Sequence, residues 1–237
     1  GGVIAAGLAG PARISTGNLR DFVLGTRLMD GRGEDLSFGG KVMKNVAGYD
    51  VSRLLPGSLG TLALLLEASV KVLPKPAATA SLRCTITQDR ALRILNEWAG
   101  QPLPLNASAW IGKTNEEGQL TVRLAGANAA VATASKMMVA ELSATLMDFT
   151  DAVTFWNELR EQAHVWFKEL APGNALWRLS LPANCPSIPM PIGFNPTSIM
   201  EWHGQQRWFQ GPANQSISNT LIAVSYTHLT LPTKRIV

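Results

Sequence analysis

The sequence predicts an α+β protein in two parts, and two observations carry that prediction. Most of the close-set glycines lie in residues 1–73, whereas the chain after Pro74-Lys75-Pro76 consists of longer periodic segments. Those later segments follow the order strand, helix, strand, strand, helix, strand, which is the order of a ferredoxin-like sandwich. We therefore expect one domain over residues 1–76 and a second, incomplete domain over residues 77–223.

The first part predicts a β-hairpin, a short helix and a further strand. Residues 22–29 and 34–38 form the hairpin strands, because Asp30-Gly31-Arg32-Gly33 supplies the positive φ angles of a tight turn. Residues 49–55 predict a short helical stretch. Residues 62–73 alternate between polar and apolar side chains, as a strand does.

The second part supplies the elements of the sandwich. Its strands are expected at residues 81–87, 108–113, 119–125 and 146–150, and its helices at 89–99 and 129–144. Asp89 is the expected N-cap of the first helix. Val131, Ala134 and Met138 lie at helical spacing in the second.

The chain beyond residue 150 predicts one more helix and three short strands. The helix begins at Asp151 and carries its apolar side chains on one side (Trp156, Leu159, Ala163, Trp166, Phe167 and Leu170). The strands are expected at residues 177–181, 198–202 and 206–210, on either side of a proline-rich stretch.

Composition excludes several function classes. The net charge of +4 is dispersed, without a run of Lys or Arg that would follow a nucleic-acid backbone. The uncharged apolar runs are well short of the roughly 20 residues that span a bilayer. Cys84 and Cys185 are far apart and lack a CxxC motif, so neither a disulfide framework nor a metal site is expected. These features favour a reducing, cytoplasmic setting.

Signatures of catalytic sites are absent from the sequence. There is no GxxxxGK[ST], HExxH, GxSxG or strict GxGxxG motif. Glu161-x-x-His164 resembles half of a di-iron helix motif, but such a pair more often contains only a histidine on the surface of a helix. His203 beside Glu201 is a lone polar pair on a predicted strand. No catalytic residue is assigned.

Glycine is concentrated in two tight clusters. The first is GGVIAAGLAG at residues 1–10, and the second is GSLGTL at residues 57–62. A backbone without Cβ approaches a ligand closely, and its N–H groups can point at an anion such as a pyrophosphate. Each cluster alone is equally a pair of tight turns.

The segment between the clusters makes a resemblance specific. KNVAGYDVSRL at residues 44–54, followed by GSLGTL and the strand ending in KVLPKP, resembles the FAD-binding domain of vanillyl-alcohol oxidase (PCMH-type) flavoproteins. Within them the chain is most similar to the E subunits of bacterial glycolate oxidase, through GGVIAAGLAGPARIS, RDFVLGTRLMDGRGE and FGGKVMKNVAGYD. The match covers residues 1–212 and is most specific over the first 76 positions.

This resemblance implies a fold and a function. The fold would be the C-terminal part of a PCMH-type FAD-binding domain followed by a ferredoxin-like α+β cap domain. The function would be that of an FAD-binding subunit in a complex that oxidises glycolate, a small 2-hydroxy acid, to glyoxylate. Its partners would be a catalytic FAD subunit and an iron-sulfur subunit, and only these would bring the chain to the inner face of the cytoplasmic membrane.

The resemblance also assigns residues to the cofactor. The expected FAD-binding positions come from both glycine clusters and the stretch between them (Gly1, Gly2, Ala5, Ala6, Gly7, Gly10, Gly17, Val23, Gly57, Ser58, Gly60, Thr61 and Leu62). Lys44, Asn45 and Tyr49 have a near-cofactor role in this assignment. A capped helix entry with a locally bonded Tyr hydroxyl is the alternative for these three.

Three departures from the catalytic relatives keep other functions open. Leu59 stands where many of them carry Glu in a GSEGTLG motif, the first phosphate-binding loop of such domains is not in the sequence, and paired substrate-site histidines are missing. The alternatives are a stand-alone FAD-dependent 2-hydroxyacid dehydrogenase of the D-lactate type, and a structural subunit that has lost FAD.

Residues 224–237 fit neither the family nor the preceding chain. They resemble translated adapter or vector DNA, and we expect them to be a non-native tail. Without Lys234 and Arg235 the net charge of +4 becomes +2.

Overall fold

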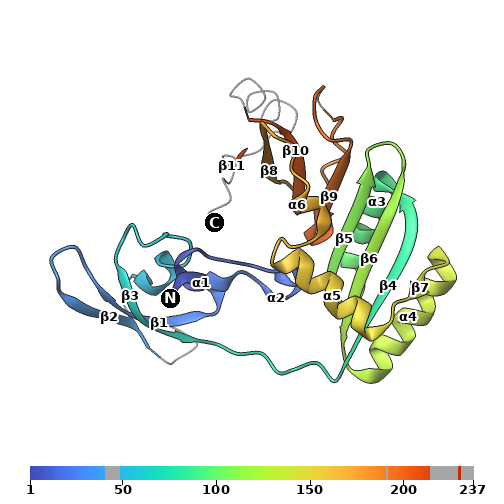
Figure 1. Ribbon diagram of the computed structural model, residues 1–237. Helices are drawn as coiled ribbons and strands as arrows, with labels where there is room; N and C mark the ends of the chain where they lie inside the picture. The colour runs from blue at the N-terminus through green and yellow to red at the C-terminus, as the bar shows by residue number, and fades with distance from the viewer. Residues whose placement is uncertain (41–48, 191, 214–228, 231–237) are drawn as a thin grey trace. The chain divides into compact units, whose positions relative to one another are not determined.

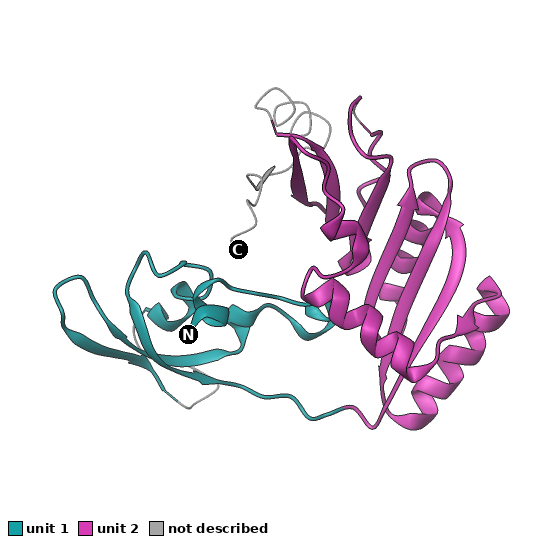
Figure 2. Ribbon diagram, in the orientation of Figure 1, with its two compact units in different colours: residues 1–75 teal, residues 76–237 magenta. Residues whose placement is uncertain are grey.

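The computed structural model describes residues 1–40, 49–190, 192–213 and 229–230. It divides into two compact units, Gly1–Lys75 and Pro76–Val237, called unit 1 and unit 2 below. Figure 2 colours unit 1 teal and unit 2 magenta. The change of unit falls at the proline pair that the sequence marks as a boundary.

Unit 1 is built on a three-stranded antiparallel sheet with the order β2-β1-β3. The strands are β1 (Val23–Met29), β2 (Asp35–Gly39) and β3 (Leu64–Val70). The predicted hairpin is confirmed: the Asp30 carboxylate accepts the N–H groups of Arg32 and Glu34, and Gly33 adopts a φ of +81°. The third strand is shorter than the predicted 62–73.

Short helical turns complete unit 1. They are α1 (Gly2–Ala5), α2 (Arg13–Thr16) and the 3₁₀ turns η1 (Leu19–Asp21) and η2 (Val51–Leu54). The helical stretch predicted over residues 49–55 is therefore a 3₁₀ turn. Buried Ser52 holds it in place, because its hydroxyl donates to the carbonyl of Phe38 at the end of β2.

Unit 2 contains one eight-stranded sheet with the order β11-β8-β10-β9-β5-β6-β4-β7. Its strands are β4 (Ala78–Thr87), β5 (Leu105–Lys113), β6 (Glu117–Gly126), β7 (Thr145–Leu146), β8 (Asn174–Ser180), β9 (Thr197–Glu201), β10 (Gln206–Pro212) and β11 (Leu229–Thr230). The neighbours β5-β6-β4-β7, with α3 (Gln88–Ala99) and α4 (Asn128–Leu142), have the ferredoxin-like order predicted from the sequence.

Two hydrophobic layers cover the two faces of this sheet, because successive strand residues point to opposite sides. On β6, Leu120, Val122 and Leu124 pack with α3 and α4 in the larger core. On the opposite face, α5 (Phe149–Arg160) and α6 (Val165–Lys168) place Trp156, Phe167 and other aromatic side chains on β5, β9 and β10. Figure 1 shows α5 crossing that face.

Several predicted boundaries in unit 2 are wrong, each for a local reason. Thr87, not Asp89, caps α3, because its hydroxyl accepts the N–H of Arg90. The helix expected from Asp151 is two helices, since Gln162 adopts a φ of +52° and ends the helical path. The closing strand expected at 146–150 is only β7, because Asp148 caps α5 there.

The predicted tail lies mostly outside the described residues. Residues 224–228 and 231–237 are not described, and Leu229–Thr230 pair with β8 as the two-residue strand β11. The non-native origin of residues 224–237 stays a prediction. Within the described ranges, no helix has the length and apolar character needed to cross a membrane.

Candidate functional site

The first glycine cluster forms a short helix and a sharp turn. Gly1 is the N-cap of α1, Ala6 is its C-cap, and Gly7 follows with a φ of +61°. The N–H of Gly7 donates to the carbonyl of Ile4 at 2.9 Å. A left-handed φ is readily adopted only by glycine, so the turn explains the residue at position 7.

The second cluster forms a loop with repeated left-handed backbone. Gly57, Leu59 and Gly60 have φ angles of +87°, +54° and +77°. The hydroxyl of Thr61 closes the loop by donating to the carbonyl of Ser58 at 2.6 Å. Leu59 has the same kind of φ without being glycine, and its side chain is 73% exposed. The loop therefore holds Leu59 in a strained conformation.

Backbone hydrogen bonds join the two clusters into one surface, called the glycine site below and defined by residues 1–7 and 57–62. Gly57 N–H donates to the carbonyl of Ile4 at 3.2 Å, and Leu59 N–H donates to that of Ala5 at 2.8 Å. A Cβ on Gly7 would lie 3.0 Å from both Cα and N of Gly57. Glycine at position 7 is thus required by the close approach of the two segments as well as by its φ.

The hydrogen bonds also limit which N–H groups of the glycine site are available to a ligand. Gly57 and Leu59 donate to the first cluster, Ser58 donates to the carbonyl of Leu55 just before the loop, and Thr61 donates to that of Ser58. In the described part of the chain, no hydrogen bond is made by the N–H of Gly60. Fewer N–H groups of these loops can therefore reach an anion than the sequence suggests, because most of the N–H groups already donate hydrogen bonds within unit 1.

Other glycines of the site leave the backbone open. A Cβ built on Gly1, Gly2, Gly57 or Gly60 would meet no atom within 4 Å. These positions present bare backbone to open space, which a flat or extended ligand can approach closely. Leu62, the last residue of the loop, is 58% exposed beside them.

The remaining predicted residues are not part of this surface. The carbonyl of Gly10 accepts the N–H of Arg13, and Gly17 ends α2 with a φ of +100°. Val23 is 1% exposed and pairs with Val70 of β3. Its side chain is therefore buried.

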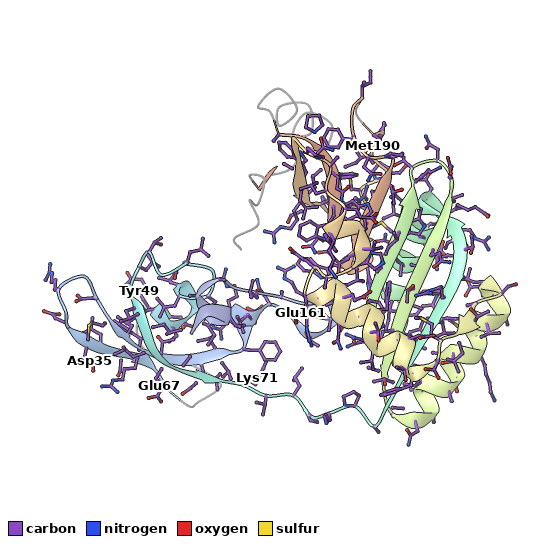
Figure 3. The ribbon with its side chains drawn as sticks, in the orientation of Figure 1. Asp35, Tyr49, Glu67, Lys71, Glu161 and Met190 are labelled. Atoms are coloured by element: carbon purple, nitrogen blue, oxygen red, sulfur yellow. The ribbon has the colours of Figure 1, made fainter. Side chains whose placement is uncertain are left out.

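The segment between the clusters is described only from Tyr49 onward. Lys44 and Asn45 lie outside the described residues. Tyr49, labelled in Figure 3, is 95% exposed. Its carbonyl accepts the N–H of Val51 at the start of η2. The exposed ring is available for contact with a ligand or with another chain.

The comparisons with known proteins bear on this site. No protein-family model matches the chain. The glycolate oxidase subunit GlcE of Escherichia coli (strain K12) is 42% identical over 216 residues, which are 91% of this chain and 56% of that subunit. Over nine-tenths of its length the chain is therefore similar to this E subunit. It spans little more than half the length of this curated relative.

Further relatives match shorter stretches of the chain. The glycolate oxidase subunit GlcD of Bacillus subtilis (strain 168) is 42% identical over 82 residues, 35% of this chain and 17% of that subunit. A D-lactate dehydrogenase of Archaeoglobus fulgidus is 32% identical over 106 residues, 44% of this chain and 24% of that enzyme.

Solved structures show the fold of the chain. An alkyldihydroxyacetonephosphate synthase superimposes with a TM-score of 0.58 and 14% identity, over 94% of this chain and 53% of that one. A variant of berberine bridge enzyme gives a TM-score of 0.51 and 16% identity, with the same coverage of both chains. The predicted fold class, a PCMH-type part followed by a ferredoxin-like part, is confirmed.

The buried titratable side chains in the described part of unit 2 have local partners or are shifted in pKa by burial. Burial raises the pKa of Glu201, whose carboxylate accepts the N–H groups of Trp208 and Gln206. Burial lowers the pKa of His203 to about 4. His164 is the N-cap of α6, where Nδ1 accepts the N–H of Trp166, rather than a residue on a helix surface. Within the described ranges no group of His, Cys, Asp and Glu is suited to hold a metal ion.

Two features, one in each unit, escaped the sequence prediction. The left-handed conformation of Leu59 has no sequence signal, because leucine rarely adopts it. Arg123 was also overlooked, although its position gave a signal. It lies between Val122 and Leu124 on a predicted strand and therefore points away from the main core, where it lines a cavity.

Proposed function

We propose that this chain is the FAD-binding E-type subunit of a glycolate oxidase and takes part in the oxidation of glycolate to glyoxylate. The observation that carries the proposal is the glycine site. Two glycine clusters, about fifty residues apart in the sequence, are hydrogen-bonded into one backbone surface, and the Cβ positions of Gly1, Gly2, Gly57 and Gly60 on it face open space. The similarity to the glycolate oxidase E subunit suggests the reaction, and the curated relatives are oxidoreductases of hydroxy acids.

The residues of the glycine site fit the pyrophosphate and ring edge of FAD. The open backbone at Gly1, Gly2, Gly57 and Gly60 admits a close approach, and the N–H of Gly60 is available to an anionic oxygen. FAD supplies the two-electron redox chemistry when bound, and the chain supplies binding and orientation. Ala5, Ala6, Gly7, Ser58, Thr61 and Leu62 complete the proposed contact set; Gly10, Gly17, Val23, Lys44, Asn45 and Tyr49 are proposed to lie farther along the cofactor.

The proposed assembly follows from the family. A D-type subunit, which would be the catalytic flavoprotein, and an iron-sulfur subunit that accepts electrons from flavin are the proposed partners. The relatives named as E and D subunits of glycolate oxidase support a complex of several chains. We place the complex in the cytoplasm, at the inner face of the membrane, with any membrane contact made by the partners.

Two other functions are less well supported. A stand-alone D-lactate type dehydrogenase would agree with the D-lactate dehydrogenase relative, but that match covers 44% of this chain, against 91% for the E subunit. A structural subunit without FAD would agree with Leu59, which offers no polar group to a cofactor. Turnover by the isolated full-length chain separates the first from our proposal, and flavin content separates the second.

The test compares two glycines with the same backbone strain. Gly60 and Gly33 have φ angles of +77° and +81°, and a Cβ on either would meet nothing within 4 Å. We expect Gly60→Val to remove one flavin equivalent from the full-length subunit co-expressed with its partners, because the valine occupies the cofactor surface. Gly33→Val in the β1–β2 hairpin imposes similar strain and should leave flavin content unchanged. An unchanged flavin content in the Gly60 variant, or an equal loss in both, would sink the proposal.

A further inference from the structure

Arg123 is held rigidly on the α5 side of the unit 2 sheet. Its Nε donates to Oδ1 of Asn106 on β5 at 2.7 Å, and its guanidinium carbon lies 5.0 Å from the centre of the Trp156 ring on α5. On the neighbouring strand β4, Ser81 is its register partner and accepts the indole N–H of Trp156. The guanidinium is thus fixed in orientation by an amide on one side and an aromatic face on the other.

The positive charge of Arg123 has no acidic counterpart in the described part of the chain. No ion pair involves it, and nearby Arg160 is paired with Glu161 at 2.7 Å. Burial, followed by the charge of Arg160, lowers the pKa of Arg123. Neither Nη1 nor Nη2 makes a hydrogen bond to a described residue. A half-buried cation without an anion is costly, and this one has its two outer nitrogens free for a ligand.

Beside Arg123 lies a cavity of about 810 Å³. Ser81, Asn106 and Arg123 line it from the strands of the sheet. Residues 149–157 of α5 line it from the helix. The rim is apolar and exposed: Phe149 is 72% and Val153 43% accessible. Asp148 also lines it, but its carboxylate caps α5 by accepting the N–H of Thr150 at 2.8 Å.

We propose that this cavity binds an amphipathic monocarboxylate, with its carboxylate on Nη1 and Nη2 of Arg123 and its hydrocarbon part along Phe149 and Val153. A planar guanidinium is matched to a carboxylate, which it binds with two parallel hydrogen bonds. The volume is that of a typical pocket for a ligand of ten or more heavy atoms, far more than a two-carbon acid fills. The site uses no residue of the glycine site, so it stands independently of the proposed flavin function.

Isothermal titration of the full chain with octanoate tests this site. We expect saturable one-to-one binding, at least about tenfold tighter than that of octanamide, which has the same shape but no charge to pair with Arg123. Glycolate should bind at least about tenfold more weakly than octanoate, because it lacks the apolar part. Equal binding of octanoate and octanamide, tighter binding of glycolate, or no octanoate binding would overturn the proposal.

Variants locate the binding. Arg123→Gln should weaken octanoate binding by about tenfold or more, whereas Arg93→Gln, an exposed arginine on α3, should leave it unchanged. Val153→Glu keeps Arg123 and changes only a partly exposed rim residue, so the fold is preserved. Its carboxylate should repel or replace the ligand and also weaken binding by about tenfold. Unchanged affinity in Val153→Glu, or an equal loss in Arg93→Gln, would contradict the assigned position.

Discussion

The two units keep their shape by different means. Unit 2 has a core on each face of its sheet, with Trp98, Trp110 and Trp177 almost completely buried. In the described part of unit 1, the buried hydrophobic side chains are Val23, Leu28 and Leu55, while leucines such as Leu64 on β3 are 62% exposed. Unit 1 is instead organised by backbone hydrogen bonds between glycine-containing turns.

This difference separates a unit with open backbone from a unit with a large side-chain core. A side-chain core tolerates little change but leaves few open backbone groups, whereas glycine turns leave backbone exposed and bury less hydrophobic surface. Unit 1 therefore has the properties of a binding surface that gains stability from what it contacts. Unit 2 has the properties of a domain that folds on its own core.

The largest expected effect is the loss of a core tryptophan in unit 2. Trp110 is completely buried, its indole donates to the carbonyl of Ile86 at 2.9 Å, and Gly112 and Gly118 leave room for its ring. We expect Trp110→Ala to lower the free energy of unfolding by about 3–5 kcal/mol. Urea unfolding followed by tryptophan fluorescence measures this, because every tryptophan of the chain lies in unit 2.

The matched control lies in unit 1. Leu64→Ala removes a mostly exposed side chain from β3, so the tryptophan-detected unfolding should change by less than about 0.5 kcal/mol. A shift as large as that of the Trp110 variant would mean that the two units do not differ in the way described above.

The next largest effect is the pH dependence of unit 2 stability through His203. This side chain is 7% exposed, and burial lowers its pKa from 6.5 to about 4. Between those values the unfolded chain binds a proton that the folded chain does not. The free energy of unfolding therefore falls as pH decreases from 6.5 to 4, by about 3 kcal/mol for this group. His203→Asn should remove that slope, and asparagine tolerates the φ of +55° at this position.

Urea unfolding at several pH values between 4 and 7 checks this effect. Glu201 is the comparison, because its contribution to the free energy of unfolding changes with pH in the opposite direction. Burial raises the pKa of Glu201 above its usual 4.5, so its contribution to stability is present below that pH and decreases as pH rises. Glu201→Gln should reduce the fall in the free energy of unfolding as pH rises. It should leave in place the fall that His203 causes as pH decreases from 6.5 to 4. An unchanged slope in His203→Asn would show that folding does not lower the pKa of His203.

Local patterns in the sequence were sufficient for much of the fold. The alternation of Leu120, Val122 and Leu124 fixes which face of β6 is buried, and the order of elements gives the ferredoxin-like topology. The close-set glycines indicated tight turns or an open backbone, and Gly57 and Gly60 have positive φ angles. These features depend on residues near each other in the chain.

Features that depend on distant contacts were not predictable. The apolar spacing from Trp156 to Phe167 is the same for one helix or two, and the break at Gln162 depends on how α6 packs on the sheet. The cavity at Arg123 exists because α5 crosses the sheet at that place. The sequence identified both glycine clusters, but not that the N–H groups of Gly57 and Leu59 join them.

The smallest expected effect concerns strain within the glycine site. Leu59 adopts a φ of +54°, and its side chain is 73% exposed, so Leu59→Gly removes the strain and loses little burial. We expect the loop to gain about 1 kcal/mol, seen as about fivefold slower hydrogen exchange of the residue-59 amide that donates to Ala5. Leu62→Gly is the control, because residue 62 has no left-handed φ in the structure and glycine there adds only chain entropy, which should speed exchange. Slower exchange in Leu59→Gly alone would mean that unit 1 stores strain in the surface proposed to meet FAD. Equal or faster exchange would mean that the leucine side chain supports the loop, and that unit 1 also depends on side-chain packing there.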